Sequence, residues 1–260
     1  MSRFVKIAAG VAIGALLLGG CSVQNMGDDV YGTIESGKLT MCADVPYAPF
    51  EFEDAQSSTG YSGFDVEIVS AIAESLGLTL VVVDSDFDAL QSGVTLAAGK
   101  CDVAASAMTI TDARKANIDF TEPYYDSLQS LLVKGDSGYK TLADLDGKRI
   151  GVQTGTTGEN YAKENAPAGA EIVSFPSDGE LWPAIQARQV DAILQDQPVN
   201  FEHTKDGSGY IIIEEYPTDE HYGIAMEKGK NPDLLKSINE ALAGLRDNGT
   251  YDKIYEKYFG

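Results

Sequence analysis

The stretch "GFDVEIVSAIAESLGLTLVVVD", residues 63–84, joins a helical pattern to a short buried strand. Its first part is apolar at the spacing of one helix face, through Phe64, Val66, Ile68, Val69, Ile72, Ala73 and Leu76. Such a stripe predicts a helix that packs against a core. The run "LTLVVVD" that follows is rich in β-branched residues and predicts a strand. The stretch therefore predicts one helix–strand step of an α/β fold.

The same alternation continues on both sides of this stretch. The strand-like "KLTMCAD" (38–44) and a Pro-rich loop precede it, and the helix-like "FDALQSGVTLAAGK" (87–100) and the strand-like "CDVAASAM" (101–108) follow it. A βαβαβ order of this kind calls for a parallel sheet with helices on its faces. We expect this sheet to form the core of a first lobe.

A second α/β series occupies residues 148–196, with strands "KRIGVQ", "AEIVSFP" and "VDAILQD" separated by helix-like runs. In each series a helix end, a polar pair and an aspartate, Asp102 or Asp191, precede an apolar strand. The match is short, but it supports two lobes that are built alike.

The tail, residues 221–260, offers one more strand and two helices. Helices at the end of a chain need a surface for their apolar faces, and the first lobe is the natural candidate. The chain would then cross between the lobes twice, near 128–135 and near 218–226. Ligands in open α/β sheets bind at the carboxyl ends of strands, so we expect a cleft between the lobes.

The first residues predict secretion and a lipid anchor. "MSRFVK" supplies two cations, "IAAGVAIGALLL" a short apolar core, and "LGGC" a lipoprotein processing box. We predict a signal peptide over residues 1–20, a lipidated Cys21 and a flexible tether over 21–37. The alternative for Cys21 is a free or disulfide-bonded cysteine behind an ordinary signal. The folded part would lie outside the cytoplasm, at a bacterial cell surface or in a periplasm, and would be held to the membrane by lipid alone.

We divide the remaining chain into a first lobe, residues 38–127 with 223–260, and a second lobe, residues 128–222. Apolar residues make up 43% of the sequence, enough to bury a core. The formal net charge is −21, with 40 acidic residues against 19 Lys and Arg. Phosphate backbones and anionic lipid surfaces would be repelled, which excludes nucleic acid as a partner.

Cys42 and Cys101 lie in or beside strands that could be neighbours in the first sheet. Disulfides persist outside the cytoplasm, so we favour a bridge between these two residues over two buried thiols.

Arg114 is a cation in an unusual place. The segment "TDARKAN" (111–117) predicts a short helix capped by Thr111, which puts Arg114 in the first turn, at the positive end of the helix. A guanidinium there could bind a carboxylate at two points. The alternative is an ordinary ion pair with Asp112, Asp119 or Glu122.

Three other features point at the same cleft. Asp196 ends the strand "VDAILQD" and suits an ammonium partner, or it caps a helix or turn. Thr156 and Thr157 in "QTGTTGEN" could offer hydroxyls and N–H groups to an anion, or form a plain strand–helix turn. The aromatics in "DVPYAPFEF", which are Tyr47, Phe50 and Phe52, could cover a ligand or pack the lobe edge. Together they describe a clamp for a zwitterion.

Six segments in register over residues 38–260 resemble the bacterial extracellular solute-binding proteins of the polar amino-acid type, family 3. They are "KLTMCADVPYAPFEF", "GFDVEIVSAIAESLG", "CDVAASAMTITDARKANIDFTEPYY", "KRIGVQTGTTGENY", "DAILQDQP" and "YGIAMEKG…YFG". The resemblance implies an α/β fold of the two-lobe, type II periplasmic-binding-protein class, in which each lobe is a sheet flanked by helices and two strands form the hinge. It implies a monomeric receptor that delivers an amino acid to an ABC transporter permease.

The resemblance also implies roles for individual residues. Arg114 would bind the ligand's α-carboxylate with the backbone N–H of Thr109 and with Thr157, while Asp196 and the carbonyl of Ala107 would bind the α-ammonium. Tyr47 would stack on the ligand. Further pocket positions of the family match Asp44, Phe87, Ser106, Met108, Gln153 and Gly158. The neutral Gln153 and the absence of a side chain at Gly158 leave the amino acid open, and the acidic Asp44 and Glu51 favour a cationic or amide side chain.

Two other functions fit the same fold. A dehydratase acting on an amino-acid-like or prephenate-like substrate would need an acid in the cleft, such as Glu51 or Glu122. A sensory or channel-gating module would need a membrane segment and an output domain, which we do not expect here. The motifs G-x-S-x-G and H-E-x-x-H are absent, and we expect no catalytic residue, no metal and no cofactor. In the empty protein we expect Arg114 to face water or to hold Glu122.

Overall fold

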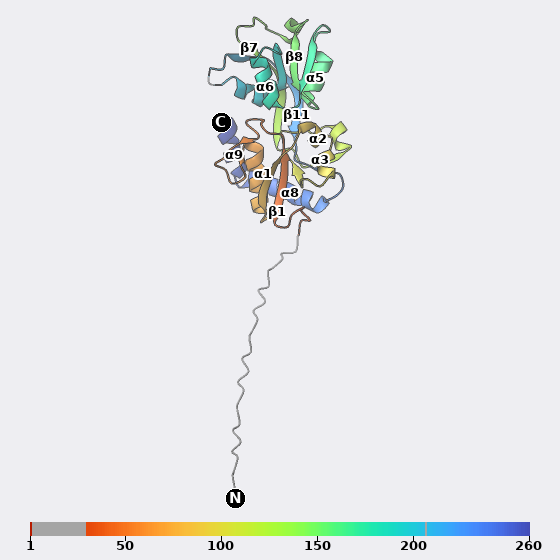
Figure 1. Cartoon of the computed structure of the whole chain (residues 1–260), viewed down its shortest axis with the longest axis vertical. Helices are drawn as coiled ribbons and strands as arrows, with labels where there is room; N and C mark the ends of the chain where they lie inside the picture. Colours follow the sequence, from red (N-terminus) through yellow and green to blue (C-terminus); the bar gives the residue numbers. More distant parts are fainter. Residues whose placement is uncertain (2–29, 206) are drawn as a thin grey trace.

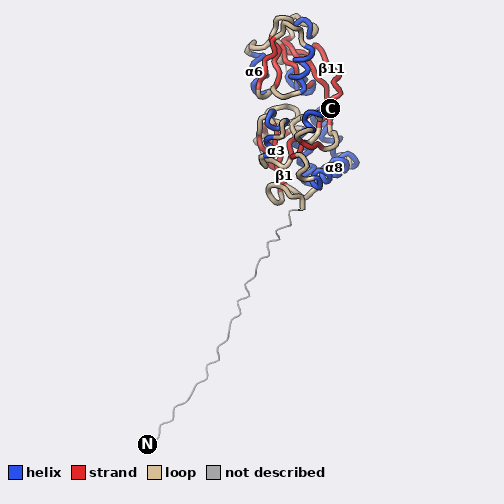
Figure 2. Tube along the Cα trace, turned by 90° about the vertical axis from the view of Figure 1, so that its right-hand side faces the viewer, coloured by secondary structure: helices blue, strands red, loops and turns tan. Residues whose placement is uncertain are grey.

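The computed structural model describes residue 1, residues 30–205 and residues 207–260. The predicted signal peptide, Cys21 and the first part of the predicted tether therefore fall outside the described residues, apart from Met1. The described chain forms two bodies (Figure 1). One contains β1, α1, α2, α3, α8 and α9, and the other contains β8, α5 and α6. A perpendicular view separates the same two bodies (Figure 2).

The first lobe is built on a five-stranded sheet with the order β4-β1-β5-β12-β6. Its strands are β1 (Lys38–Ala43), β4 (Thr79–Asp84), β5 (Val103–Ala104), β6 (Ile118–Phe120) and β12 (Ala225–Glu227). A small hairpin, β2 (Phe52–Glu53) and β3 (Tyr61–Ser62), lies outside it. The helices are α1 (Phe64–Ser75), α2 (Phe87–Gln91), α3 (Val94–Ala97), α4 (Asp112–Lys115), α8 (Pro232–Asp247) and α9 (Thr250–Phe259). As predicted, β1 pairs in parallel with β4 and β5, and the tail strand β12 joins the same sheet.

The second lobe is built on a sheet with the order β11-β7-β10-β8-β9. Its strands are β7 (Tyr125–Lys134), β8 (Arg149–Gln153), β9 (Glu171–Phe175), β10 (Ala192–Asp196) and β11 (Tyr210–Tyr222). Its helices are the 3-10 turn η1 (Leu142–Leu145), α5 (Thr157–Asn165), α6 (Asp178–Gln186) and α7 (Gln197–His203). The two sheets flanked by helices confirm the predicted fold class.

The hinge consists of the antiparallel strands β7 and β11. They pair from Tyr125 opposite Tyr222 to Lys134 opposite Tyr210, with irregularities between Ile212 and Glu214 and between Tyr216 and Glu220. The chain leaves the first sheet after β6 and returns to it at β12, directly after β11. We therefore keep residues 38–127 with 223–260, and residues 128–222, as the proposed division into lobes.

The two aspartates that precede equivalent strands make the same contacts. The Asp102 carboxylate accepts from the N–H of Thr40 at 2.8 Å, and its own N–H donates to the Thr40 carbonyl. Asp191 does the same with Arg149 of β8, at 2.9 Å. In both lobes the aspartate that precedes one strand is hydrogen-bonded to the parallel neighbouring strand. The short sequence repeat therefore corresponds to a repeated pair of hydrogen bonds.

Two details differ from the prediction. The segment 87–100 is not one helix, because Gly93 has a left-handed φ of +81° that ends α2 and starts α3. Part of the predicted tether, residues 30–37, contacts the first lobe. There the N–H of Ile34 donates to Asp102 and the carbonyl of Tyr31 accepts from Asn231.

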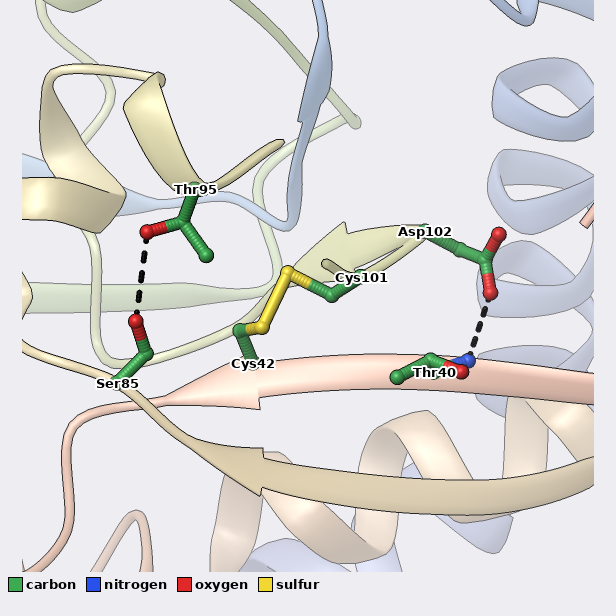
Figure 3. Close-up of a disulfide and its surroundings, with 6 residues drawn as sticks. All are labelled: Thr40, Cys42, Ser85, Thr95, Cys101 and Asp102. Atoms are coloured by element: carbon green, nitrogen blue, oxygen red, sulfur yellow. Dashed lines mark hydrogen bonds between the residues drawn. A yellow bond between two sulfur atoms is a disulfide. The ribbon is translucent and has the colours of Figure 1, made fainter. Parts of the chain in front are cut away.

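A disulfide joins Cys42 of β1 to Cys101, which lies two residues before β5, and this confirms the predicted pairing (Figure 3). The bond lies on the first sheet, close to the Thr40–Asp102 contact. Among the helices of the described residues, none combines the length and apolar character needed to cross a membrane.

Candidate functional site

A small cavity lies between the two lobes. It is lined by Asp44, Tyr47, Phe87, Ser106, Ala107 and Thr109 of the first lobe and by Gln153, Thr156, Thr157 and Asp196 of the second. Most of these residues sit where a strand ends. Asp44 follows β1, Ser106 comes shortly after β5, and Gln153 and Asp196 end β8 and β10. The carboxyl ends of strands from both lobes thus meet at one cavity, as expected for an α/β ligand site.

Asp196 is the buried second-lobe acid that lines the cavity. Its carboxylate accepts hydrogen bonds from the hydroxyl of Tyr47 at 3.0 Å, from that of Tyr222 at 2.6 Å and from the Gln129 amide. Burial raises its pKa to about 7, and the charge of Glu220 adds to the effect. The group is therefore poised to ionise when a cation enters the cavity.

Asp44 is the corresponding acid of the first lobe. Its carboxylate accepts from the Gln153 amide across the cleft at 2.5 Å. Burial raises the pKa of Asp44 to about 7, against the opposing effect of the Gln153 hydrogen bond. Nearby carboxylates, such as Asp84 and Asp86, raise it further. The cavity thus has an acid from each lobe and favours a ligand that brings positive charge.

Arg114 lies behind the cavity wall rather than in it. Thr111 caps α4 as predicted and accepts from the Arg114 N–H at 3.2 Å. Arg114 is only 5% exposed, and its guanidinium lies 5.2 Å from the centre of the Phe87 ring. It donates to the carbonyl of Thr109 at 2.7 Å and, across the cleft, to that of Gly155 at 3.0 Å.

In this structure Arg114 does not face water and does not contact Glu122. Glu122 is exposed, and its backbone N–H donates to Asn239. The other predicted ion-pair partners are engaged elsewhere, because Asp112 pairs with Lys115 and Asp119 pairs with Lys228. Burial lowers the pKa of Arg114 to about 10, which leaves it charged at neutral pH. The sequence could not show that a second-lobe carbonyl, that of Gly155, reaches this side chain.

Glu220 is an acid of the site that the sequence analysis missed. It lies on the hinge strand β11, is 6% exposed and accepts from the hydroxyls of Thr109 at 2.7 Å and Thr157 at 2.8 Å. Its other oxygen accepts from the Gln129 amide at 3.1 Å. One carboxylate on the hinge is thus hydrogen-bonded to both lobes.

Two fully buried acids support the loop that follows β5. Ser106 donates to Glu51 and accepts from the N–H of Asp44, and the N–H of Ala107 donates to Asp65 at 2.7 Å. Burial and mutual repulsion raise the pKa of Glu51, and burial raises that of Asp65 to about 7. Glu51, considered above as a catalytic acid, does not line the cavity but sits behind Ser106.

Nine of the twelve predicted ligand-binding residues line the cavity; Arg114, Met108 and Gly158 do not. Met108 is fully buried in the first lobe's core, beside Phe87. Gly158 faces the interior, because a Cβ there would lie 2.7 Å from the Gln129 side-chain oxygen. Of the three candidate lid aromatics only Tyr47 reaches the cavity, and Phe50 packs in an aromatic core cluster. Within the ranges 30–205 and 207–260, no cluster of His, Cys, Asp and Glu is arranged to hold a metal ion.

Comparison with known proteins places this geometry in context. The model of "Bacterial extracellular solute-binding proteins, family 3" matches residues 39–260. The L-arginine-binding protein of Pseudomonas aeruginosa is 36% identical over 239 residues, which cover 85% of this chain and 90% of the relative.

Two solved structures are similarly close. An ancestral arginine-binding protein bound to glutamine has a TM-score of 0.80 and 38% identity, over 87% of this chain and 99% of that one. An ancestral amino-acid-binding protein, described as a precursor of cyclohexadienyl dehydratase, has a TM-score of 0.78 and 36% identity, over 86% and 96%.

Proposed function

Because the chain belongs to the bacterial extracellular solute-binding proteins, family 3, we propose that it is a receptor that captures a free amino acid and delivers it to an ABC transporter permease. The observation that carries this proposal is the cavity itself. Acids from both lobes line it, Arg114 lies directly behind it, and two strands join the lobes around it. This arrangement suits a small zwitterion.

We assign the two ends of the ligand to opposite parts of the cavity. Asp196 would bind the α-ammonium with the carbonyl of Ala107, and Tyr47 would stack on the ligand. Arg114, the backbone N–H of Thr109 and the hydroxyl of Thr157 would bind the α-carboxylate. Charge-assisted hydrogen bonds of this kind are the strongest available in a buried site.

The ligand's side chain would extend toward Asp44 and Gln153, which face each other across the cleft. A carboxylate and an amide at this end favour a cationic or amide side chain. Two of the proteins compared above fit this class, because one is named an L-arginine-binding protein and the other is an ancestral arginine-binding protein bound to glutamine.

We expect the lobes to close on the ligand because the proposed ligand-binding residues belong to both lobes. Asp196 and Thr157 belong to the second lobe and Tyr47 and Arg114 to the first, so a ligand is fully bound only when the lobes meet. A ligand with more contacts in the closed form shifts the population toward it. The permease would then recognise the closed receptor.

A dehydratase remains the alternative, because one structural neighbour is described as the precursor of such an enzyme. The candidate acids argue against it in this chain, since Glu51 sits behind Ser106 and Glu122 is exposed. We therefore propose binding without a chemical step.

The test is a thermal-shift screen with the twenty amino acids. We expect one amino acid, or a small group with cationic or amide side chains, to raise the melting temperature, as any ligand specific for the folded state does. No shift with any amino acid or close analogue would contradict the proposal.

We also propose that the receptor is a monomer anchored through a lipid on Cys21. A Cys21→Ser variant should be released from the membrane fraction while it still binds the ligand. Retention of this variant in the membrane fraction would contradict the anchor.

A further inference from the structure

We propose that Asp178 and His203, which lie outside the cavity, set how strongly the site prefers a cationic over an amide side chain. Ionised Asp178 favours a positive charge at the Asp44 end of the cavity, and protonated His203 cancels this preference. The inference rests on the proposed function, because it concerns the same amino-acid site. It adds a pair of residues behind the cavity wall to the side chains that line the cavity.

The pair is buried within the second lobe, where Asp178 begins α6 and His203 ends α7. The Nε2 atom of His203 lies 3.0 Å and 3.1 Å from the two carboxylate oxygens of Asp178. The two side chains are 14% and 7% exposed, respectively. The Gln195 amide donates to the same carboxylate at 3.1 Å. All three residues belong to one lobe, so these contacts do not depend on how far apart the lobes are.

The Asp178 carboxylate belongs to the end of the cavity that we assign to the ligand's side chain. The Gln153 amide donates to Asp44 and also, at 3.1 Å, to the carbonyl of Pro176. Pro176 lies two residues before Asp178, at the entry to α6. One amide thus connects the acid that lines the cavity to the segment that carries the acid behind it.

The start of α6 also contacts the first lobe directly. A Cβ on Gly179 would lie 3.1 Å from the ring of Pro46, which follows Asp44 by two residues. Burial raises the pKa of Asp44 to about 7, and the charge of Asp178 is one of those that raise it further. The charge of Asp178 therefore acts on the cavity, although Asp178 does not line it.

The effect on selectivity follows from the charges. An ionised carboxylate attracts a cationic ligand group and has little effect on a neutral amide. A histidine can change its charge near neutral pH. When His203 gains a proton, the pair with Asp178 becomes neutral overall and its attraction for a cationic side chain is lost. By linkage, a bound cationic side chain must make His203 harder to protonate by the same free energy.

Few other ionisable groups surround His203. Glu202 and Lys205 lie on its own helix and pair with each other. Tyr210 of β11 packs against the tryptophan ring that stacks on the imidazole. Among the described residues, Asp178 is the only charged group that is hydrogen-bonded to His203. The charge of His203 is therefore coupled most directly to this one carboxylate.

The charge of His203 can be measured by fluorescence. The sequence has one tryptophan, Trp182, whose ring stacks on His203 with centres 4.1 Å apart and planes inclined by 6°. A protonated imidazole in contact with an indole quenches its emission. We expect one transition of the emission with pH, which His203→Gln removes and Asp178→Asn moves to lower pH. His221→Gln is the matched control and should leave the transition unchanged, because this second histidine pairs with Asp126 on the hinge strands.

The selectivity is tested by repeating the titration with saturating L-arginine and L-glutamine, as probes of the two side-chain classes. We expect L-arginine to lower the midpoint by about 0.5 pH unit more than L-glutamine does. Calorimetry measures the ratio of the L-arginine to the L-glutamine affinity. Between about pH 8 and about pH 5.5 this ratio should fall about threefold more in the unaltered protein than in His203→Gln.

The isosteric Asp178→Asn should lower the same ratio at pH 8. Glu180→Gln is its matched control, because Glu180 is an exposed acid in the same helical turn, and it should leave the ratio unchanged. Equal midpoints in the two complexes, or a transition that persists in His203→Gln, would overturn the inference while the proposed function stands. Binding of neither amino acid would contradict the proposed function itself, and calorimetry shows this independently of the fluorescence.

Discussion

Arg114 of the first lobe donates a hydrogen bond of 3.0 Å to the carbonyl oxygen of Gly155 in the second lobe. The same guanidinium holds the carbonyl of Thr109, a residue of the cavity wall. Among the described residues, no carboxylate forms a salt bridge with this buried, permanently charged group. Its contacts are with neutral carbonyls, which leaves its charge available to an anion in the cavity.

Replacement of Arg114 by Ala should weaken amino-acid binding by roughly 100-fold or more, because a buried charge-assisted pair with the ligand is lost. Calorimetry measures the change. Arg246→Ala is a matched control, since Arg246 also donates to a carbonyl, that of Pro123, and lies 5.2 Å from a ring centre, that of Tyr251, but on helix α8. Equal affinities of Arg114→Ala and Arg246→Ala would refute the role of Arg114.

Binding should weaken as the pH falls below about 7. Burial raises the pKa of Asp196 and of Asp44 to about 7, so both are partly protonated near neutrality. A cationic group favours the ionised carboxylate, so binding lowers these pKa values and releases protons, and acid opposes it. Calorimetry in two buffers of different ionisation enthalpy measures the released protons. We expect Asp196→Asn to release fewer, and an affinity that stays constant between pH 5 and pH 7.5 would contradict this assignment.

The Cys42–Cys101 disulfide should stabilise the protein by roughly 4 kcal/mol, since it closes a loop with a sequence separation of 59 residues. The double variant Cys42→Ala with Cys101→Ala should therefore unfold at lower urea concentration. Peptide mass spectrometry of the denatured, non-reduced protein should find the two cysteines in one cross-linked peptide pair. Recovery of both as alkylated thiols would show that the bridge is not formed.

Gly93→Ala should destabilise the fold by about 2 kcal/mol or more, because it adds a Cβ to a left-handed residue and places it against a neighbour. The φ angle is +81°, and the new atom would lie 2.8 Å from the Ile118 side chain. Gly99→Ala separates the two causes, since Gly99 has a φ of +65° with nothing within 4 Å of the new atom. Urea unfolding should show a smaller loss for Gly99→Ala, and equal losses would mean that the contact with Ile118 has no effect.

Features that depend on local pattern could be predicted from the sequence. The apolar face of residues 64–76 and the strand that follows it predicted the α/β fold. Thr111 predicted the start of the helix that carries Arg114. Asp196 was placed at a strand end, and the structure has it at the end of β10, facing Tyr47. The identity of most pocket residues came from the family resemblance rather than from periodicity.

Features that depend on contacts between distant segments could not be predicted. Several acids crowd the segment 214–220, and strand alternation could have shown which of them points inward. The pairing of β11 with β7 is irregular between Tyr216 and Glu220, and Asp219 has a left-handed φ of +54°, so the alternation is lost just before Glu220. The contact of Arg114 with Gly155 likewise depends on how closely the lobes approach each other. Local sequence patterns do not predict this distance.

The central claim is that the cavity binds one amino acid and does not transform it. The most direct measurement is calorimetric titration with the amino acid that gives the largest thermal shift, followed by chemical identification of the ligand recovered from the complex. The account predicts one molecule bound per chain and recovery of the same amino acid, chemically unchanged. Consumption of the ligand, or no binding by any of the twenty amino acids, would contradict it.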